Sequence, residues 1–152
     1  MENKIKDVEK IAKELFSLLG SKTDLEVSFD EKNEAVVVDV KTEDEAGLLI
    51  GRQGETLMAI QTILGMMVRK GLGEWVRIVV NVGDWREKQE SYLKEMALQT
   101  AARAKETGEP QYLYNLTSNQ RRIIHLTLSE DGEVETESQG EDKERYLIIR
   151  KK

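Results

Sequence analysis

The sequence predicts an α+β protein of two small domains, a three-stranded α/β sandwich followed by a second α/β domain. Three observations support this fold class. Helical and strand-like hydrophobic periodicities alternate along the chain, glycines mark the breaks between them, and Gly83-Asp84 separates two sets of elements. A length of 152 residues is enough for two small domains. We expect these domains to span residues 1–83 and 84–152.

The first half is expected to fold in the order helix, strand, strand, helix, helix, strand. The predicted elements are a helix over 4–19, strands over 25–29 and 36–40, helices over 46–50 and 55–69, and a strand over 75–82. The longer of the last two helices should turn inward an apolar stripe made by Leu57, Ile60, Ile63, Leu64 and Met67. Since a two-helix crossover joins the second and third strands, these strands should be parallel, with the helices on one face of the sheet.

The second half is expected to begin with a long helix that Asp84 can cap. The predicted elements are this helix over 85–106, an extended piece over 112–116, a helix capped by Thr117 or Ser118, and strands over 133–138 and 145–150. Ile123, Ile124 and Leu126 should form the core-facing side of the shorter helix.

Composition narrows the class of protein. With 39% hydrophobic and 34% charged residues the chain is typical of globular proteins. No apolar run approaches the roughly 18 residues that span a bilayer, so no membrane insertion is expected. The start of the chain lacks the features of a signal peptide, which predicts a cytoplasmic protein. The absence of cysteine excludes thiol catalysis, disulfides and thiolate metal sites, and no cofactor is expected.

The net charge of −6 is a mild argument against nucleic acid, because lysine and arginine supply most of the non-specific affinity for phosphates. The acidity is unevenly distributed. Residues 129–144 hold eight carboxylates against one lysine, whereas residues 84–128 are close to neutral. The acidic stretch is best explained as a solvated hairpin face, which would also repel RNA from that edge.

The sequence Gly51-Arg52-Gln53-Gly54 lies between two predicted helices. Two glycines permit a sharp turn and leave the backbone open, so that a phosphate can approach the amide groups at the start of the following helix. Arg52 adds a charge and Gln53 a polar contact, and bases would then lie in an apolar groove beside the helix. A bare Gly-x-x-Gly is more often a helix end followed by a tight turn, and both interpretations stay open on spacing alone.

The stretch 47–57, together with the order of the elements, resembles the signature of the KH family in its prokaryotic, type II topology. The resemblance covers residues 3–83. It implies that Gly51, Arg52, Gln53 and Gly54 hold the backbone of single-stranded RNA or DNA. Neither Gly-x-Gly-x-x-Gly nor Gly-Lys-Ser/Thr is present, which argues against a dinucleotide or nucleoside triphosphate site.

A second candidate site is the helical sequence Arg121-Arg122-Ile123-Ile124-His125. Arg121 and His125 are four residues apart and share a helix face, where guanidinium and imidazole can reach one phosphate or base edge. A surface arginine and a packing histidine are the alternative. A long helix, an extended piece, Arg-x-x-x-His and two strands resemble the R-three-H domain, whose members bind single-stranded nucleic acid. This resemblance implies Arg121, Arg122 and His125 as RNA-binding residues.

A KH domain followed directly by an R-three-H domain resembles the Jag family, also called KhpB, EloR or SpoIIIJ-associated protein. Trp85-Arg86 is similar to the Tyr-Arg of the family's link. The chain begins directly with the KH domain, without the N-terminal domain that members usually carry, so roles that depend on that domain are left open. Gln120 replaces an acid common before the two arginines, Gln89 replaces a basic residue, and a Pro-Met pair before the helix is missing. These departures are expected to weaken or re-tune the second site without altering the fold.

These features predict a non-catalytic protein that binds single-stranded RNA, with single-stranded DNA left open. The family resemblance implies a post-transcriptional regulator or RNA chaperone that has a second small KH-domain protein as a further partner. The alternative is a protein-interaction adaptor, which the acidic total and the apolar groove favour. An enzyme is not expected, because one histidine, no cysteine and no paired-carboxylate motif leave few convergent groups for catalysis.

Two further predictions concern single side chains. Trp75, Trp85, Tyr112 and Tyr114 can stack on bases, although aromatic residues at such positions are more often core or rim residues. Replacing Gly54 by Asp should put a carboxylate where a phosphate binds. We expect that change to cut RNA affinity and leave the thermal midpoint nearly unchanged.

Overall fold

The computed structural model describes residues 1–152, which fold into two compact units, Met1–Arg86 and Glu87–Lys152. The predicted class of mixed helices and small sheets is confirmed. The first unit extends past Asp84 because Trp85 packs on its core and Arg86 is hydrogen-bonded to it. None of the helices combines the length and the apolar composition that crossing a bilayer requires.

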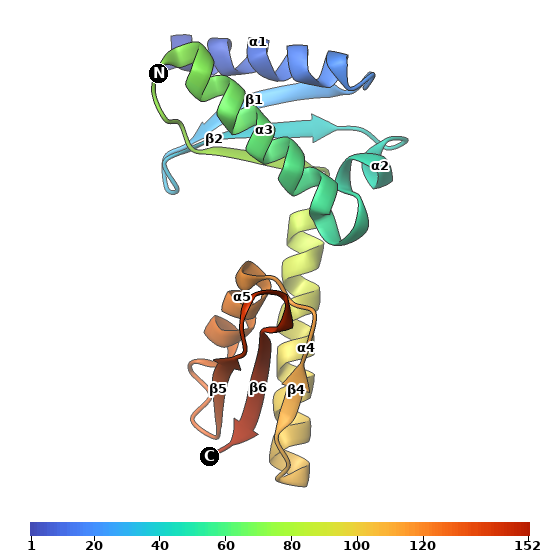
Figure 1. Ribbon diagram of the computed structural model, residues 1–152, viewed down its shortest axis with the longest axis vertical. Coiled ribbons are helices and arrows are strands. Elements are labelled where there is room, and N and C mark those ends of the chain that lie inside the picture. Colours follow the sequence, from blue (N-terminus) through green and yellow to red (C-terminus); the bar gives the residue numbers. More distant parts are fainter. The chain divides into compact units, whose positions relative to one another are not determined.

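The first unit has the element order that the sequence predicts (Figure 1). Its elements are α1 (Glu2–Leu18), β1 (Asp24–Asp30), β2 (Ala35–Lys41), α2 (Ala46–Ile50), the 3₁₀ turn η1 (Arg52–Gly54), α3 (Glu55–Leu72) and β3 (Ile78–Val82). The strands lie in the order β1-β2-β3, with β1 and β2 antiparallel. β2 and β3 are parallel, with Val36 opposite Ile78 and Val40 opposite Val82, as the crossover requires.

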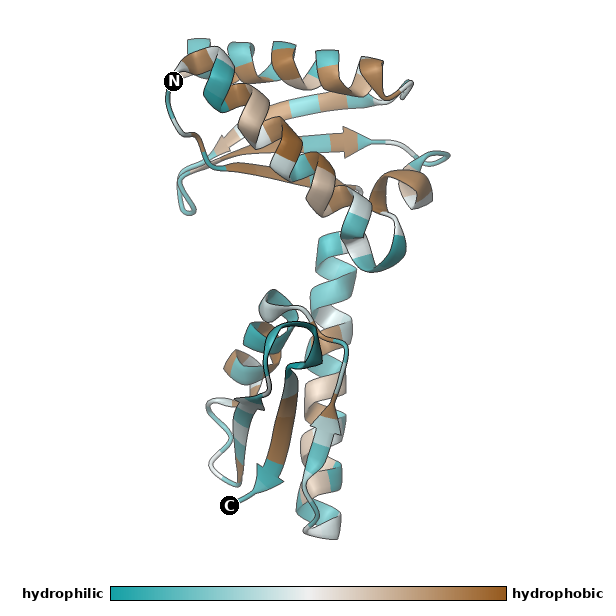
Figure 2. Cartoon of the chain, viewed as in Figure 1, coloured by the Kyte–Doolittle hydropathy of each residue, from teal (hydrophilic) through white to brown (hydrophobic).

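The core of the first unit lies between the sheet and the helices α1 and α3, which cover the same face (Figure 1). β-branched residues of β2 and β3 fill it, and Figure 2 shows hydrophobic residues along most of β3. The buried stripe of α3 consists of Leu57, Ile60, Leu64 and Val68. The prediction for Ile63 is wrong, since this side chain is 47% exposed.

The second unit contains a three-stranded antiparallel sheet backed by two helices. Its elements are α4 (Trp85–Thr107, of which the first two residues belong to the first unit), β4 (Gln111–Leu113), α5 (Ser118–Leu128), β5 (Val134–Gln139), the 3₁₀ turn η2 (Asp142–Glu144) and β6 (Tyr146–Lys151). The strand order is β4-β6-β5. The extended piece predicted over 112–116 therefore contributes an edge strand, which covers Gln111–Leu113.

Helices α4 and α5 pack on one face of this sheet through a core of small and branched side chains. Buried residues of the core are Leu93, Ala97, Ala101, Ala104, Ile124, Leu128, Val134, Leu147 and Ile149. The three alanines on one side of α4 let the other elements approach that helix closely. Leu126 does not join the core as predicted, because it is 56% exposed and Leu128 takes the inward position one turn after Ile124.

Candidate nucleic-acid interface

The Gly-x-x-Gly loop joins α2 to α3 in a conformation that requires glycine at both ends. Gly51 has φ +70° and Gly54 has φ +79°. A Cβ on Gly51 would also lie within 3.0 Å of three atoms of Thr56. Arg52 and Gln53 between them are exposed. The glycines end α2 and begin α3, which confirms the interpretation as a helix end followed by a tight turn. The loop also presents two polar side chains to solvent, so phosphate binding at this loop stays a prediction.

Gly54 is buried because the indole ring of Trp85 covers it. A Cβ on Gly54 would lie within 3.0 Å of three ring carbons of Trp85. The prediction that Gly54→Asp leaves the thermal midpoint unchanged is therefore wrong. That substitution puts a side chain into the space of the indole and a non-glycine residue into left-handed backbone. A variant that tests RNA contact at this loop must change Arg52 or Gln53 instead.

Arg86 fixes the chain next to Trp85. Its Nε and one terminal nitrogen donate to the carbonyl oxygen of Val80 at 3.1 and 3.0 Å, and that terminal nitrogen also donates to Oε1 of Gln61 at 2.7 Å. The Val80 amide donates to the same Gln61 oxygen at 3.0 Å. Burial lowers the pKa of the Arg86 guanidinium, which stays protonated because the usual value is so high. These bonds hold the start of α4 against α3 and β3, and so hold Trp85 beside the loop.

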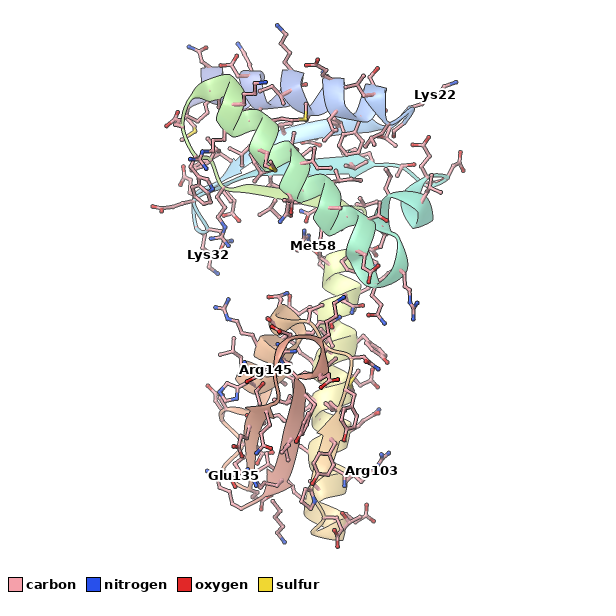
Figure 3. All side chains as sticks on the ribbon, viewed as in Figure 1. Lys22, Lys32, Met58, Arg103, Glu135 and Arg145 are labelled. Carbon is pink, nitrogen blue, oxygen red and sulfur yellow. The ribbon has the colours of Figure 1, made fainter.

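Apolar side chains flank the loop on both sides. Leu48 in α2 is 80% exposed and Met58 in α3 is 46% exposed. Figure 3 labels Met58 on α3, and its sulfur lies 3.9 Å from a terminal nitrogen of Arg86. Exposed apolar side chains next to a turn that exposes Arg52 and Gln53 offer a place for the bases of a strand whose phosphates lie on the turn.

The helix α5 begins with a capping box that fixes its first turn. The Thr117 hydroxyl accepts from the Gln120 amide at 3.2 Å, and the Gln120 side-chain oxygen accepts from the Thr117 amide at 2.9 Å. Glutamine serves this arrangement as well as glutamate does. The departure of Gln120 from the acid usual in the family therefore leaves the start of α5 intact, and with it the placement of the arginines that follow.

A surface pocket of about 470 Å³ opens between α5 and the β5–β6 hairpin. It is lined by Ser118, Arg121, Arg122, His125, Thr136, Ser138, Arg145 and Leu147. All three residues that the sequence analysis predicted for the second site line this pocket. The lining holds three arginines and three hydroxyl groups but no carboxylate. Such a set of donors suits a phosphate or another oxyanion.

Hydrogen bonds hold two of the predicted side chains at the pocket. Arg121 donates to the carbonyl oxygen of Leu116 at 2.6 Å and to the Ser118 hydroxyl at 3.0 Å. His125 is hydrogen-bonded through Nδ1 to the hydroxyl of Thr136. Arg122, by contrast, is exposed and makes no ion pair. Arg121 therefore has a fixed position, and Arg122 is free to turn toward a ligand.

The structure adds pocket residues that the sequence analysis missed. Arg145 donates through Nε to the Ser138 hydroxyl at 2.6 Å, which leaves its terminal nitrogens for a ligand. Arg145 lies between η2 and β6 in the chain, and Figure 3 labels its side chain. Thr136 and Ser138 lie on the same side of β5 as the buried Val134. The sequence does contain one signal for these two residues. Hydroxyl side chains occupy alternate positions of the strand, where a strand packed on a helix usually has apolar side chains.

Comparison with known protein families identifies two domains in this chain. Residues 6–80 match the family described as "KhpA/KhpB, KH domain", and residues 91–151 match the R-three-H domain. The first match contains the Gly-x-x-Gly loop, and the second contains the arginine pocket. The link that carries Trp85 and Arg86 falls between the two matches.

Curated relatives of this chain bear the name RNA-binding protein KhpB. The chain is 30% identical over 136 residues to the KhpB of Clostridium symbiosum, an alignment that covers 90% of this chain and 61% of that protein. It is 31% identical over 131 residues to KhpB of Lactiplantibacillus plantarum, covering 86% and 40% of the two chains. Identity with KhpB of Bacillus subtilis is 32% over 110 residues, covering 71% and 53%. The chain thus spans from 40% to 61% of the length of these relatives.

Proposed function

Because the chain belongs to the KhpB (Jag) family, in which a KH domain is joined to an R-three-H domain, we propose that it binds single-stranded RNA through both units. The observation that carries the proposal is the pocket with three arginines and no carboxylate on a protein whose net charge is −6. Positive charge gathered at one place in an acidic protein favours an anionic ligand at that place.

In the first unit, the RNA backbone lies against the Gly-x-x-Gly loop. The two glycines carry no side chain of their own, and the amide groups at the start of α3 attract a phosphate. Arg52 pairs with a phosphate and Gln53 contributes a polar contact. The bases lie toward the exposed apolar side chains Leu48 and Met58.

In the second unit, the pocket holds a phosphate of the same or another strand. Arg121 and Ser118 form one wall, and Arg145 and Ser138 form the other. The function is binding without catalysis. His125, the only histidine of the chain, is bonded to a threonine hydroxyl rather than to a carboxylate that could make it a stronger base. Two weak sites on one chain gain affinity from their high effective concentration.

The cellular role that fits these properties is post-transcriptional regulation or RNA chaperoning in the cytoplasm. A second small KH-domain protein is a further candidate partner, as the family resemblance implies. Single-stranded DNA is a further candidate ligand, because phosphate contacts do not distinguish the two nucleic acids.

Fluorescence anisotropy with short single-stranded RNA and DNA tests the proposal across a salt series. Arg122→Ala should weaken RNA binding and flatten the dependence of log Kd on log salt by about 0.7, the change expected for one lost phosphate contact on a single strand. Arg103→Ala is a matched control, because it removes the same charge from an exposed site of the same unit outside the pocket. It should leave the salt dependence unchanged.

Two results would count against this function. Equal losses in Arg122→Ala and Arg103→Ala would mean that the pocket attracts RNA only through net charge. Absence of binding to any oligonucleotide at low salt would exclude RNA binding by the isolated chain and favour the adaptor alternative.

A further inference from the structure

Three tyrosines form a cluster on the outer face of the sheet in the second unit. Side chains alternate along a strand, and Leu113, Leu147 and Ile149 point toward the helices. Tyr112 of β4 and Tyr146 of β6 therefore point to the opposite face, and Tyr114 follows directly after β4. The ring centroids of Tyr114 and Tyr146 lie 5.4 Å apart, those of Tyr112 and Tyr146 6.1 Å, and those of Tyr112 and Tyr114 6.5 Å.

This tyrosine cluster (Tyr112, Tyr114 and Tyr146) is not part of a core. Tyr112 is 50% exposed and Tyr114 is 60% exposed, so much of both rings is accessible. Ile148 lies on the same face of β6 and is only 6% exposed. The need to cover Ile148 explains why large side chains lie on this face, but large aliphatic residues would cover Ile148 equally well. It does not explain three aromatic rings in mutual contact with accessible surface.

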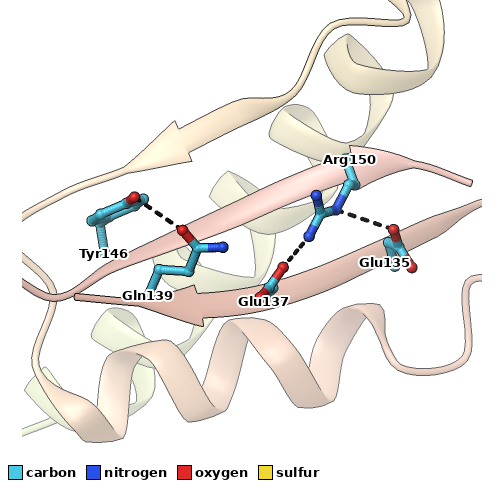
Figure 4. Close-up of polar contacts among 5 residues, drawn as sticks. All are labelled: Glu135, Glu137, Gln139, Tyr146 and Arg150. Atoms are coloured by element: carbon cyan, nitrogen blue, oxygen red, sulfur yellow. Dashed lines mark hydrogen bonds and ion pairs between the residues drawn. The ribbon is translucent and has the colours of Figure 1, made fainter.

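The tyrosine cluster and the arginine pocket meet at the end of the β5–β6 hairpin. Ser138 and Arg145 line the pocket, and the next residue in each case, Gln139 and Tyr146, points to the other face of the sheet. Figure 4 shows the Tyr146 hydroxyl donating to the Gln139 side-chain oxygen at 3.2 Å. The arginine pocket and the tyrosine cluster are therefore adjacent across the Gln139–Tyr146 pair, the last pair of strand residues before the acidic loop.

The outer face near the cluster carries a net negative charge, because one arginine serves two glutamates there. Glu135 and Glu137 of β5 both pair with Arg150 of β6, as Figure 4 shows. The other acidic residues nearby lie in the hairpin loop and are Glu141, Asp142 and Glu144. Stacking uses the faces of bases and needs no positive charge, whereas a phosphate beside this loop would be repelled. The face therefore suits bases, and the pocket suits phosphates.

We propose that the tyrosine cluster is a base-stacking surface for single-stranded RNA, continuous with the arginine pocket around the β5–β6 hairpin. The proposal rests on the RNA-binding function proposed above and extends it to a second face of the R-three-H domain. Tyrosine rings stack on any base, so this surface adds affinity without strong sequence preference. Proline-rich peptides also bind aromatic faces, and they are the ligand class that the test must separate from RNA.

The test compares a uridine oligomer with a ribose-phosphate oligomer of equal length that lacks bases. Tyr112→Leu combined with Tyr114→Leu keeps apolar cover over Ile148 and removes two ring faces. This variant should bind the uridine oligomer about tenfold more weakly than the parent, the loss expected for one stacked base, and bind the abasic oligomer equally well. The corresponding double phenylalanine variant should bind as the parent does. Tyr92→Leu is the matched control, because Tyr92 is 60% exposed on α4 and contacts no other ring.

The outcomes separate this proposal from the proposed function. If Arg145→Ala weakens binding of both oligomers while the leucine variant matches the parent on both, the pocket binds RNA and the stacking surface is wrong. Equal weakening of both oligomers by the leucine variant also overturns the stacking surface, since bases would then play no part. Binding of a proline-rich peptide that the leucine variant loses, with RNA binding unchanged, assigns the face to peptides. No RNA binding by the parent overturns both proposals.

Discussion

The contact between Gly54 and Trp85 predicts that the Gly-x-x-Gly loop contributes to the stability of the first unit, in addition to its proposed role in RNA binding. Gly54→Ala adds only one methyl group, but it adds it in left-handed backbone and within 3.0 Å of three indole carbons. The backbone cost is roughly 1–2 kcal/mol. Displacing a packed ring adds roughly 1–3 kcal/mol, so the free energy of unfolding of the first unit should fall by about 2–5 kcal/mol. Urea unfolding followed by tryptophan fluorescence measures this directly, because both tryptophans lie in the first unit.

The control for this experiment is Gly47→Ala in α2. Gly47 has no atom within 4 Å of a new Cβ and no positive φ, so alanine there should leave stability unchanged or raise it by up to about 1 kcal/mol. If the indole is the cause, Trp85→Leu should recover part of the loss when added to Gly54→Ala, with circular dichroism replacing fluorescence as the probe. Equal stability of the Gly54 and Gly47 variants would refute the reasoning.

Two further predictions concern the second unit. Gln120→Ala removes half of the capping box with Thr117 and should lower the free energy of unfolding by about 1 kcal/mol, whereas Gln120→Glu should keep it; thermal unfolding of the second unit by circular dichroism checks both. The hydrogen bond from Lys105 lowers the pKa of the Asp131 carboxyl, so this pair stabilises the fold above the ordinary value of 3.8 and loses its effect as the pH falls through the lower folded value. Lys105→Met should therefore lower the thermal midpoint at pH 7, with the difference from the parent shrinking in acid, and a constant difference at every pH would contradict the assignment.

The sequence predicted the fold well where a segment shows a single, unambiguous hydrophobic periodicity. The alternation in β2 and β3 and the two-helix crossover were enough to predict a parallel pair. Errors arose in helices where adjacent apolar residues both fit the pattern, so that more than one inward-facing side was possible. Ile63 and Leu64 both fit an amphipathic pattern, but only Leu64 is buried. Leu126 is exposed for the same reason, because the packing of the whole unit decides which side of a helix faces inward.

The candidate site was predictable where its residues are close in sequence. Arg121 and His125 are four apart in a helix, and both line the pocket as this spacing indicates. Arg145 was missed because it reaches the pocket only through the register of the β5–β6 hairpin, which no local pattern specifies. The contact of Trp85 with Gly54 was missed likewise. This contact depends on where the segment after β3 packs against α3. The hydrogen bonds of Arg86 to Val80 and Gln61 fix that position.

The most direct test of RNA binding by both units is a nuclear magnetic resonance titration of ¹⁵N-labelled protein with a short single-stranded RNA. Binding through both units predicts that the backbone amide signals of residues 51–54, of residues 121–125 and of Arg145 shift, while those of β1 stay in place. The side-chain Nε–H signal of Arg145, bonded to Ser138 in the free protein, should shift as well. Shifts confined to one unit would contradict binding through two modules, and shifts that avoid both segments would place the RNA elsewhere on the protein.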